Sequence, residues 1–195
     1  MPSLASASPL SSADEAASFA TSTLRLGEAT DLAFAMLRCR RAHAPAAAAL
    51  AQSATDWELP LSPNKVVASA HARALWLEPG AWLLSAEAAE LGRALAVLRA
   101  EAVAAGMHLL ATDVTSGRCA LTLSGPDARA LIASGCPIDL HPRAFRAGCC
   151  AASLFNETEV VIDQIDEAPT FRLICDRAGA RALWDQLKDA AELLP

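Results

Sequence analysis

The chain has 195 residues, of which 53% are hydrophobic and 5% aromatic, and its formal net charge is −6 at pH 7. A chain of this length and hydrophobicity can bury one good core or two small ones, which excludes global disorder. The acidic balance argues against binding nucleic acid through a basic surface, and no apolar run of roughly 18 residues predicts a membrane span.

The first 22 residues are dominated by serine and alanine, and we expect them to form a flexible N-terminal arm. The alternative is an arm that becomes ordered against another protein. Residues 23–195 are expected to form one domain built from two halves, residues 32–114 and residues 115–195.

Residues 32–114 are predicted to follow a β-α-β-β-α-β order, which is typical of ferredoxin-like folds. Pro79-Gly80 fits a type II turn, Ser85 is expected to cap a helix, and Gly106 is expected to end it. A short helix is the alternative to the first strand. The predicted elements are a strand over Leu32–Arg41, a helix over Pro45–Ser53, a proline-broken connection over Trp57–Ser69, a hairpin of Arg73–Leu77 and Ala81–Leu84, a helix between Ser85 and Gly106, and a strand over Met107–Val114.

Residues 115–195 roughly echo this order without repeating individual residues. Ser116-Gly117 is expected to form a hairpin turn, Pro126 to begin a helix, and Gly135 to end it, with both glycines at positive φ. Asp176 is expected to cap the last helix. The predicted elements are strands over Cys119–Ser124, Cys149–Phe155, Glu159–Ile165 and Thr170–Cys175, helices over Pro126–Ser134 and after Asp176, and a loop over Cys136–Gly148. The fold class is therefore α+β, with two ferredoxin-like halves and antiparallel sheets.

Six cysteines are scattered along the chain without a C-x-x-C motif: Cys39, Cys119, Cys136, Cys149, Cys150 and Cys175. A zinc site or a disulfide framework is the functional interpretation, but zinc ligands usually show tighter spacing. We interpret the cysteines as buried free thiols, which behave as small hydrophobic side chains. Free thiols, and an N-terminus without the features of a secretory signal, favour the reducing cytoplasm.

The sequence contains no motif for a nucleotide or a flavin. No G-x-G occurs among the nine glycines and no P-loop is present, so we predict no FAD, NAD or ATP site. Ser116 and Ser124 lie outside any G-x-S-x-G motif and are interpreted as turn and cap residues. The acidic residues between Glu157 and Glu167 are interpreted as a solvated strand edge. We predict no catalytic, cofactor-binding or metal-binding residue in this chain.

The Cys136–Gly148 loop is the candidate functional site. Asp139 could orient the imidazole of His141, and the two arginines of the loop could bind a carboxylate or a phosphate. The alternative is a loop held by local hydrogen bonds, since no nucleophile or second acid accompanies the histidine. Arginine and aromatic residues are enriched at protein interfaces. The residues predicted to contact a partner are His141, Arg143, Phe145 and Arg146.

Three motifs of the second half resemble the gamma subunit of heterotetrameric sarcosine oxidase. They are the Asp-Val-Thr-Ser-Gly-Arg turn at Asp113–Arg118, the Leu-Ser-Gly-Pro helix start at Leu123–Pro126, and the Gly-Cys-Pro-Ile-Asp-Leu-His-Pro loop within Gly135–Phe145. They occur in the order seen in that family, and the resemblance extends from His108 to Ala191. The family is similar in fold to the aminomethyltransferase of glycine cleavage, so the resemblance implies an aminomethyltransferase-like fold.

The resemblance also implies a function. It implies a non-catalytic, structural subunit of a complex that oxidises sarcosine to glycine and a one-carbon unit and releases hydrogen peroxide. The expected partners are the alpha, beta and delta subunits, which would carry FAD, FMN, NAD and tetrahydrofolate. The alternatives are a subunit of a related enzyme such as N-methylglutamate dehydrogenase, a stand-alone folate-binding module, and a zinc or redox protein that uses the cysteines.

Overall fold

The computed structural model describes residues 8–10, 17–70 and 72–194. The chain divides into two compact units, and neither is a single continuous stretch. Unit I consists of Asp31–Thr115 and Gly148–Ala151, and unit II consists of Met1–Thr30, Ser116–Ala147 and Ala152–Pro195. The N-terminal residues therefore belong to the same unit as the C-terminal part of the chain.

Unit I has the ferredoxin-like topology predicted for the first half, with one additional strand at an edge. Its sheet is antiparallel and has the order β4-β5-β6-β3-β7. Strand β4 is the addition, and it lies inside the predicted proline-broken connection. The elements are β3 (Ala33–Cys39), α1 (Ala44–Thr55), β4 (Val66–Ala68), β5 (Ala72–Glu78), β6 (Ala81–Ala86), α2 (Ala88–Ala104) and β7 (Leu109–Asp113).

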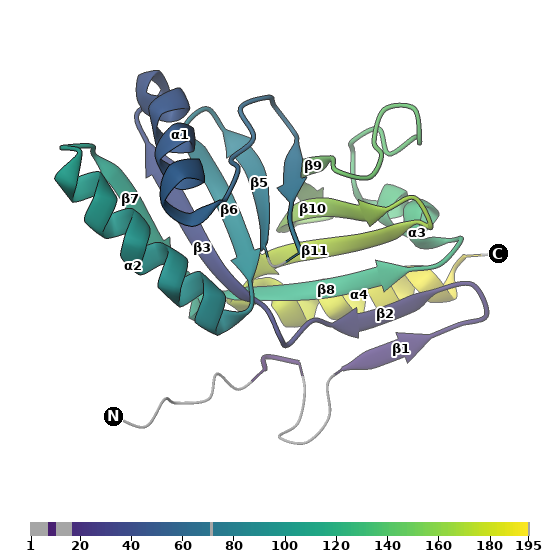
Figure 1. Cartoon of the computed structure of the whole chain (residues 1–195). Coiled ribbons are helices and arrows are strands. Elements are labelled where there is room, and N and C mark those ends of the chain that lie inside the picture. Colours follow the sequence, from purple (N-terminus) through teal and green to yellow (C-terminus); the bar gives the residue numbers. More distant parts are fainter. Residues whose placement is uncertain (1–7, 11–16, 71, 195) are drawn as a thin grey trace. The chain divides into compact units, whose positions relative to one another are not determined.

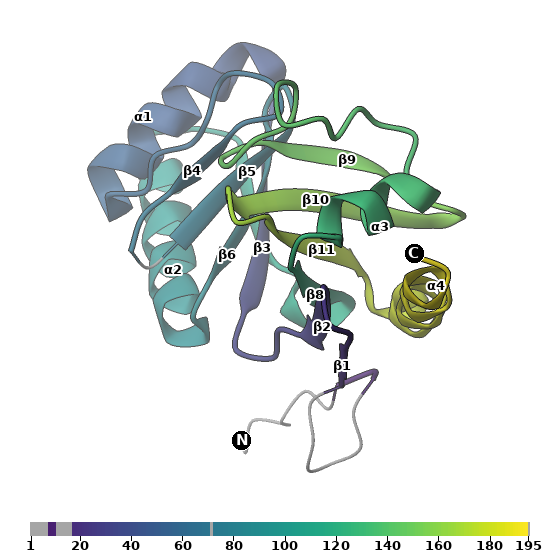
Figure 2. The same ribbon diagram turned by 90° about the vertical axis from the view of Figure 1, so that its right-hand side faces the viewer.

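Helices α1 and α2 cover one face of this sheet, and the core of unit I lies between the helices and the strands (Figures 1 and 2). The alanines of α1 keep its contact face small, and Ala47 and Ala51 are fully buried. Trp82 is also fully buried, and its indole N–H donates to the Pro60 carbonyl at 2.7 Å. This bond satisfies the one polar atom of a large apolar side chain.

The turn residues of unit I explain where its elements end. Gly80 has φ +88°, which confirms the turn between β5 and β6, and Gly106 has φ +62° just after α2. The predicted cap at Ser85 is wrong, because Ser85 is a buried residue of β6. The first turn of α2 is instead capped by the Glu87 carboxylate, which accepts from the Ala89 N–H at 3.3 Å.

Unit II contains a six-stranded antiparallel sheet of order β1-β2-β8-β11-β10-β9, with α3 and α4 on one face (Figure 2). A ferredoxin-like unit needs a fourth strand after its second helix, but the described chain ends with α4. Strand β2, from the N-terminal part of the chain, occupies that position beside β8. The elements are β1 (Ser18–Ala20), β2 (Arg25–Glu28), β8 (Arg118–Ser124), α3 (Ala128–Gly135), β9 (Cys150–Phe155), β10 (Thr158–Asp166), β11 (Thr170–Asp176) and α4 (Ala180–Glu192).

Several local predictions for unit II are wrong. The predicted flexible arm is wrong at residues 18–20, which form β1 and pair with β2, while residues 1–7 and 11–16 lie outside the described part. Gly117 belongs to a 3₁₀ turn and Gly135 to the last turn of α3, and neither has positive φ. The positive φ occurs at Gly125, with φ +117°. Helix α3 consequently begins at Ala128, two residues after Pro126.

Asp176 has a different contact from the predicted one. Its side chain caps no helix, and one of its carboxylate oxygens lies 2.5 Å from an Arg118 guanidinium nitrogen across the β8–β11 pair. A short 3₁₀ turn, Arg177–Gly179, separates β11 from α4. Ser124 is likewise the last residue of β8 rather than a helix cap. Along α4, Leu183, Trp184 and Leu187 are buried on one face.

Candidate functional site: the Cys136–Gly148 loop

The Cys136–Gly148 loop is held in one shape by a residue of α3. The Arg129 guanidinium donates to the Leu140 carbonyl and, at 3.0 Å, to the Phe145 carbonyl. The same guanidinium carbon lies 5.1 Å from the centre of the Phe171 ring, a distance typical of a cation–π contact. One side chain therefore fixes two points of the loop to the sheet of unit II.

Three side chains along the loop are buried. Cys136, Leu140 and Phe145 are each less than 10% exposed. The Cys136 sulfur lies 3.3 Å from the Ser153 hydroxyl of β9, and the Ala147 N–H donates to a Glu167 carboxylate oxygen at 3.0 Å. The buried aromatic ring corrects one of the predicted partner contacts, since Phe145 packs inside this chain and supports the loop from within.

Most of the exposed residues of the loop belong to a turn around His141. The Asp139 carboxylate accepts from the His141 backbone N–H at 2.8 Å, and so it does not orient the imidazole as predicted. The imidazole is oriented by the Arg143 backbone N–H, which donates to Nδ1 at 3.2 Å. In this bond Nδ1 of the imidazole is the acceptor. The His141 carbonyl accepts from Ala144 and Phe145 N–H groups.

The two arginines of the loop are exposed and carry the positive charge of this surface. Within residues 8–10, 17–70 and 72–194, neither Arg143 nor Arg146 forms a salt bridge. The turn places His141, Arg143 and Arg146 on the solvent side of a fixed scaffold. A preorganised surface of this kind binds a partner without a large entropic penalty for ordering the loop.

The remaining predicted groups do not assemble into a site. Of the acidic residues between Glu157 and Glu167, Asp163 is fully buried and stands opposite Arg172 in the β10–β11 register, so the description of a solvated edge is wrong there. His71 lies outside the described residues, and the part of the chain that is described contains no group of three or more His, Cys, Asp or Glu that could hold a metal ion.

Five of the six cysteines are buried and Cys39 is partly buried, and all six are free thiols. Cys119 and Cys175 face each other across β8 and β11. Hydrogen bonding of the Cys119 thiol to Cys175, together with burial, raises the pKa of Cys119, whereas the same hydrogen bond lowers the pKa of Cys175. Burial raises the pKa of the Cys39 thiol.

The comparison with solved structures first defines the class of fold. The glycine cleavage system aminomethyltransferase T from Bartonella henselae aligns over 82% of this chain and 44% of that protein with a TM-score of 0.60, at 16% sequence identity. At this identity the likeness concerns the fold alone. The chain therefore has the predicted aminomethyltransferase-like fold, built from two ferredoxin-like units.

The comparisons with sequences and a closer structure identify the family. A model of the sarcosine oxidase, gamma subunit family matches residues 38–192. A chain of the heterotetrameric sarcosine oxidase from Corynebacterium sp. U-96 aligns over 89% of this chain and 86% of that chain, with 25% identity and a TM-score of 0.75. The chain belongs to the sarcosine oxidase gamma subunit family, which confirms the resemblance seen in the sequence.

Two related sequences carry the same name. Sarcosine oxidase subunit gamma from Corynebacterium sp. (strain P-1) is 41% identical over 105 residues, which cover 50% of this chain and 46% of that protein. The Arthrobacter sp. subunit is 36% identical over 123 residues, which cover 62% of this chain and 55% of that protein. The chain thus spans about half the length of the curated relatives it matches.

Sequence reasoning missed Arg129, which organises the loop. Its two acceptors lie 11 and 16 residues further along the chain, and no local pattern connects an arginine of a helix with them.

The described residues contain no helix long and apolar enough to cross a membrane.

Proposed function

We propose that this chain is the gamma subunit of a heterotetrameric sarcosine oxidase and that it serves assembly rather than catalysis. The observation that carries the proposal is the family match over residues 38–192, which includes the whole Cys136–Gly148 loop. The similar solved chain belongs to an enzyme described as heterotetrameric, which supports other subunits as partners. We propose the alpha, beta and delta subunits as those partners.

The cofactors of the reaction are assigned to the partners. The dinucleotides FAD and NAD are typically bound through a G-x-G fingerprint, and no G-x-G occurs among the nine glycines of this sequence. FMN is assigned to the partners together with them. The fold shared with aminomethyltransferase T does not by itself carry a folate site, because fold does not imply function. Tetrahydrofolate is therefore also assigned to a partner subunit. The many buried thiols support a complex located in the reducing cytoplasm.

The exposed surface of the loop is the proposed contact with a partner. His141, Arg143 and Arg146 point outward from a scaffold that Arg129 fixes, and the arginines can pair with carboxylates of another subunit. We leave Phe145 out of this proposed contact because it is buried in the free chain. The loop would therefore recognise its partner mainly through charge-assisted hydrogen bonds.

The proposal is tested by reconstituting the complex. The chain, carrying an affinity tag, is co-expressed with the alpha, beta and delta subunits from the same organism, and the purified material is weighed by native mass spectrometry. We expect a four-subunit complex that consumes oxygen with sarcosine, while the isolated chain shows no turnover. Turnover with N-methylglutamate instead of sarcosine would assign the chain to the related dehydrogenase, and failure to co-purify would overturn the assembly role.

A further inference from the structure

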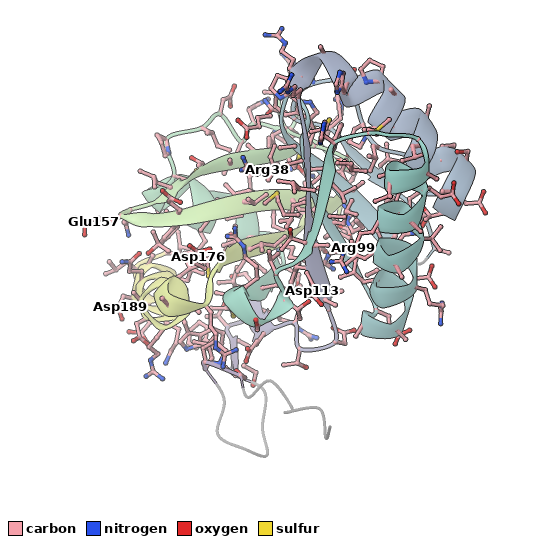
Figure 3. The ribbon with its side chains drawn as sticks, turned by 90° about the vertical axis from the view of Figure 1, so that its left-hand side faces the viewer. Arg38, Arg99, Asp113, Glu157, Asp176 and Asp189 are labelled. Atoms are coloured by element: carbon pink, nitrogen blue, oxygen red, sulfur yellow. The ribbon has the colours of Figure 1, made fainter. Side chains whose placement is uncertain are left out.

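Strand β7 is the outer strand of the unit I sheet, and a groove of about 630 Å³ runs along its first residues. The groove lies between the end of β3, the end of α2 and the start of β7. Figure 3 shows the ribbon from the side of β7, with Arg38 labelled. The residues that line it and that carry the argument are Arg38, Arg40, Val103, Met107, His108 and Leu110.

The two edges of this sheet differ. Beyond β4, the Val66 N–H donates to the Gly148 carbonyl at 2.9 Å and the Cys150 N–H donates to the Asn64 carbonyl at 3.0 Å, so the chain itself covers that edge. Beyond β7, no described strand pairs. The Arg99 side chain of α2 donates to the Ala111 carbonyl at 2.7 Å, which satisfies one outward carbonyl (Figure 3). At the start of the strand, the Leu109 N–H donates to the Met107 carbonyl at 3.0 Å.

The groove exposes large apolar side chains at this edge. Val103 is 81% exposed and Leu110 is 68% exposed, and Met107 and Leu109 lie partly buried between them and the unit I core. Native edge strands are usually protected by charged residues, prolines or bulges. An apolar strand end without that protection, continuous with an apolar helix end, is typical of an interaction surface.

The rim of the groove is basic although the whole chain carries a net charge of −6. Arg38, Arg40 and His108 line it, and Arg38 forms an ion pair with Glu78 at 3.1 Å. A second copy of this chain that bound groove against groove is a poor occupant, because that contact would bring one basic rim close to another. Complementary charge therefore requires a different protein with carboxylates beside its apolar residues.

We propose that this groove docks a segment of another oxidase subunit, which places apolar side chains against Val103 and Leu110 and carboxylates against Arg38 and Arg40. The proposal rests on the assembly function proposed above and adds a second contact, in unit I, to the loop contact in unit II. The apolar contacts supply most of the affinity, and the arginines fix the orientation of the segment and speed its association.

The test uses the co-expressed complex and three variants. Leu110→Glu and Val103→Glu place carboxylates inside the groove, and Arg40→Glu reverses a charge on its rim. Each should weaken the association of this chain with its partners by about thirtyfold or more, the effect typical of an interface anchor. All three positions are exposed, so the melting temperature of the isolated variants should stay at the wild-type value.

Leu193→Glu is the matched control, since Leu193 is 85% exposed and lies at the end of α4 in unit II. It should assemble like the wild type. Assembly of all three groove variants within twofold of wild type would overturn the groove proposal and leave the assembly function intact. A dimer of the isolated chain that Leu110→Glu dissociates would also overturn it, in favour of a second copy. Failure of the wild-type chain to assemble would remove both proposals together.

Discussion

Gly125 is the glycine of unit II at which substitution by alanine should lower the free energy of unfolding most. Its φ of +117° is a backbone conformation that residues with a side chain rarely adopt. A Cβ atom built there would lie 2.2 Å from the Thr23 carbonyl oxygen and 3.2 Å from the Leu24 Cα. Both neighbours are backbone atoms of the turn between β1 and β2, so they cannot move aside as a flexible side chain would.

The size of the effect follows from two contributions. A strained backbone conformation costs about 1–3 kcal/mol, and forcing an extra carbon into a packed site costs a further 1–3 kcal/mol, roughly. For Gly125→Ala we therefore expect the free energy of unfolding to fall by about 4 kcal/mol. A chain of this length loses roughly 2–4 °C of melting temperature per kcal/mol, so Tm should fall by about 8–16 °C in a scan followed by circular dichroism.

Two other glycines provide matched controls for the same substitution. Gly117 lies in unit II with no atom within 4 Å of an added Cβ and without positive φ, so Gly117→Ala should change the free energy by less than about 0.5 kcal/mol. Gly92 lies within α2 and is equally uncrowded, so Gly92→Ala should stabilise the protein by about 0.5–1 kcal/mol. A Gly125→Ala protein that melts at or above the wild-type temperature would refute the geometry.

Three further predictions use other parts of the chain. Gly135→Ala should lower Tm because its Cβ would lie 2.8 Å from the Phe155 ring, and the loss should shrink in a Phe155→Leu background. A thiol reagent should label six thiols in denaturant but none rapidly in the native chain. Because the pKa of the Cys39 thiol is raised, Cys39 should react more slowly than free cysteine at neutral pH, and rapid labelling of the native chain would contradict this. The isolated chain should be colourless after gel filtration, and absorbance in the flavin bands would show a cofactor site that the sequence does not reveal.

Elements with strong local signals could be predicted from the sequence. Strands β8 and β11 show apolar side chains in alternation or in short runs, which predicts strands. The turns at Gly80 and Gly106 are predicted by the residue types next to each other in the sequence. The short strands β1, β2 and β4 were missed. Segments of three or four residues are too short to give a clear pattern, and they form strands because a longer strand offers them hydrogen bonds, as β8 does for β2.

Part of the candidate site could likewise be predicted from the sequence and part could not. The loop bounds follow from Gly135, from the prolines and from the return to an apolar strand. The hydrogen bonds that hold the loop in place could not be predicted, because Arg129 and its acceptors are neighbours only in the folded chain. Gly125 illustrates the same limit. Its sequence neighbours fit an ordinary helix start, whereas the Thr23 carbonyl that leaves no room for a Cβ atom there comes from a distant part of the chain.

The burial of Phe145 and the exposure of Arg143 separate the two functions of the loop, which are stability and recognition. Phe145 is 6% exposed, so Phe145→Ala removes a buried ring and should destabilise the isolated chain by about 3–5 kcal/mol. Arg143→Ala removes an exposed side chain and leaves the backbone bond to His141 in place, so Tm should not change.

With the partner subunits present, the measured quantity is assembly, and here we expect Arg143→Ala to have the larger direct effect. Arg143→Ala should weaken assembly by about tenfold or more if its guanidinium pairs with a carboxylate of the partner, and Arg143→Lys should restore part of the loss by keeping the charge. Phe145→Ala should affect assembly only to the extent that it unfolds the loop, so a lower temperature should restore binding. Assembly of Arg143→Ala at wild-type strength would show that the loop is a structural feature of this chain, and the groove beside β7 would then remain as the proposed contact.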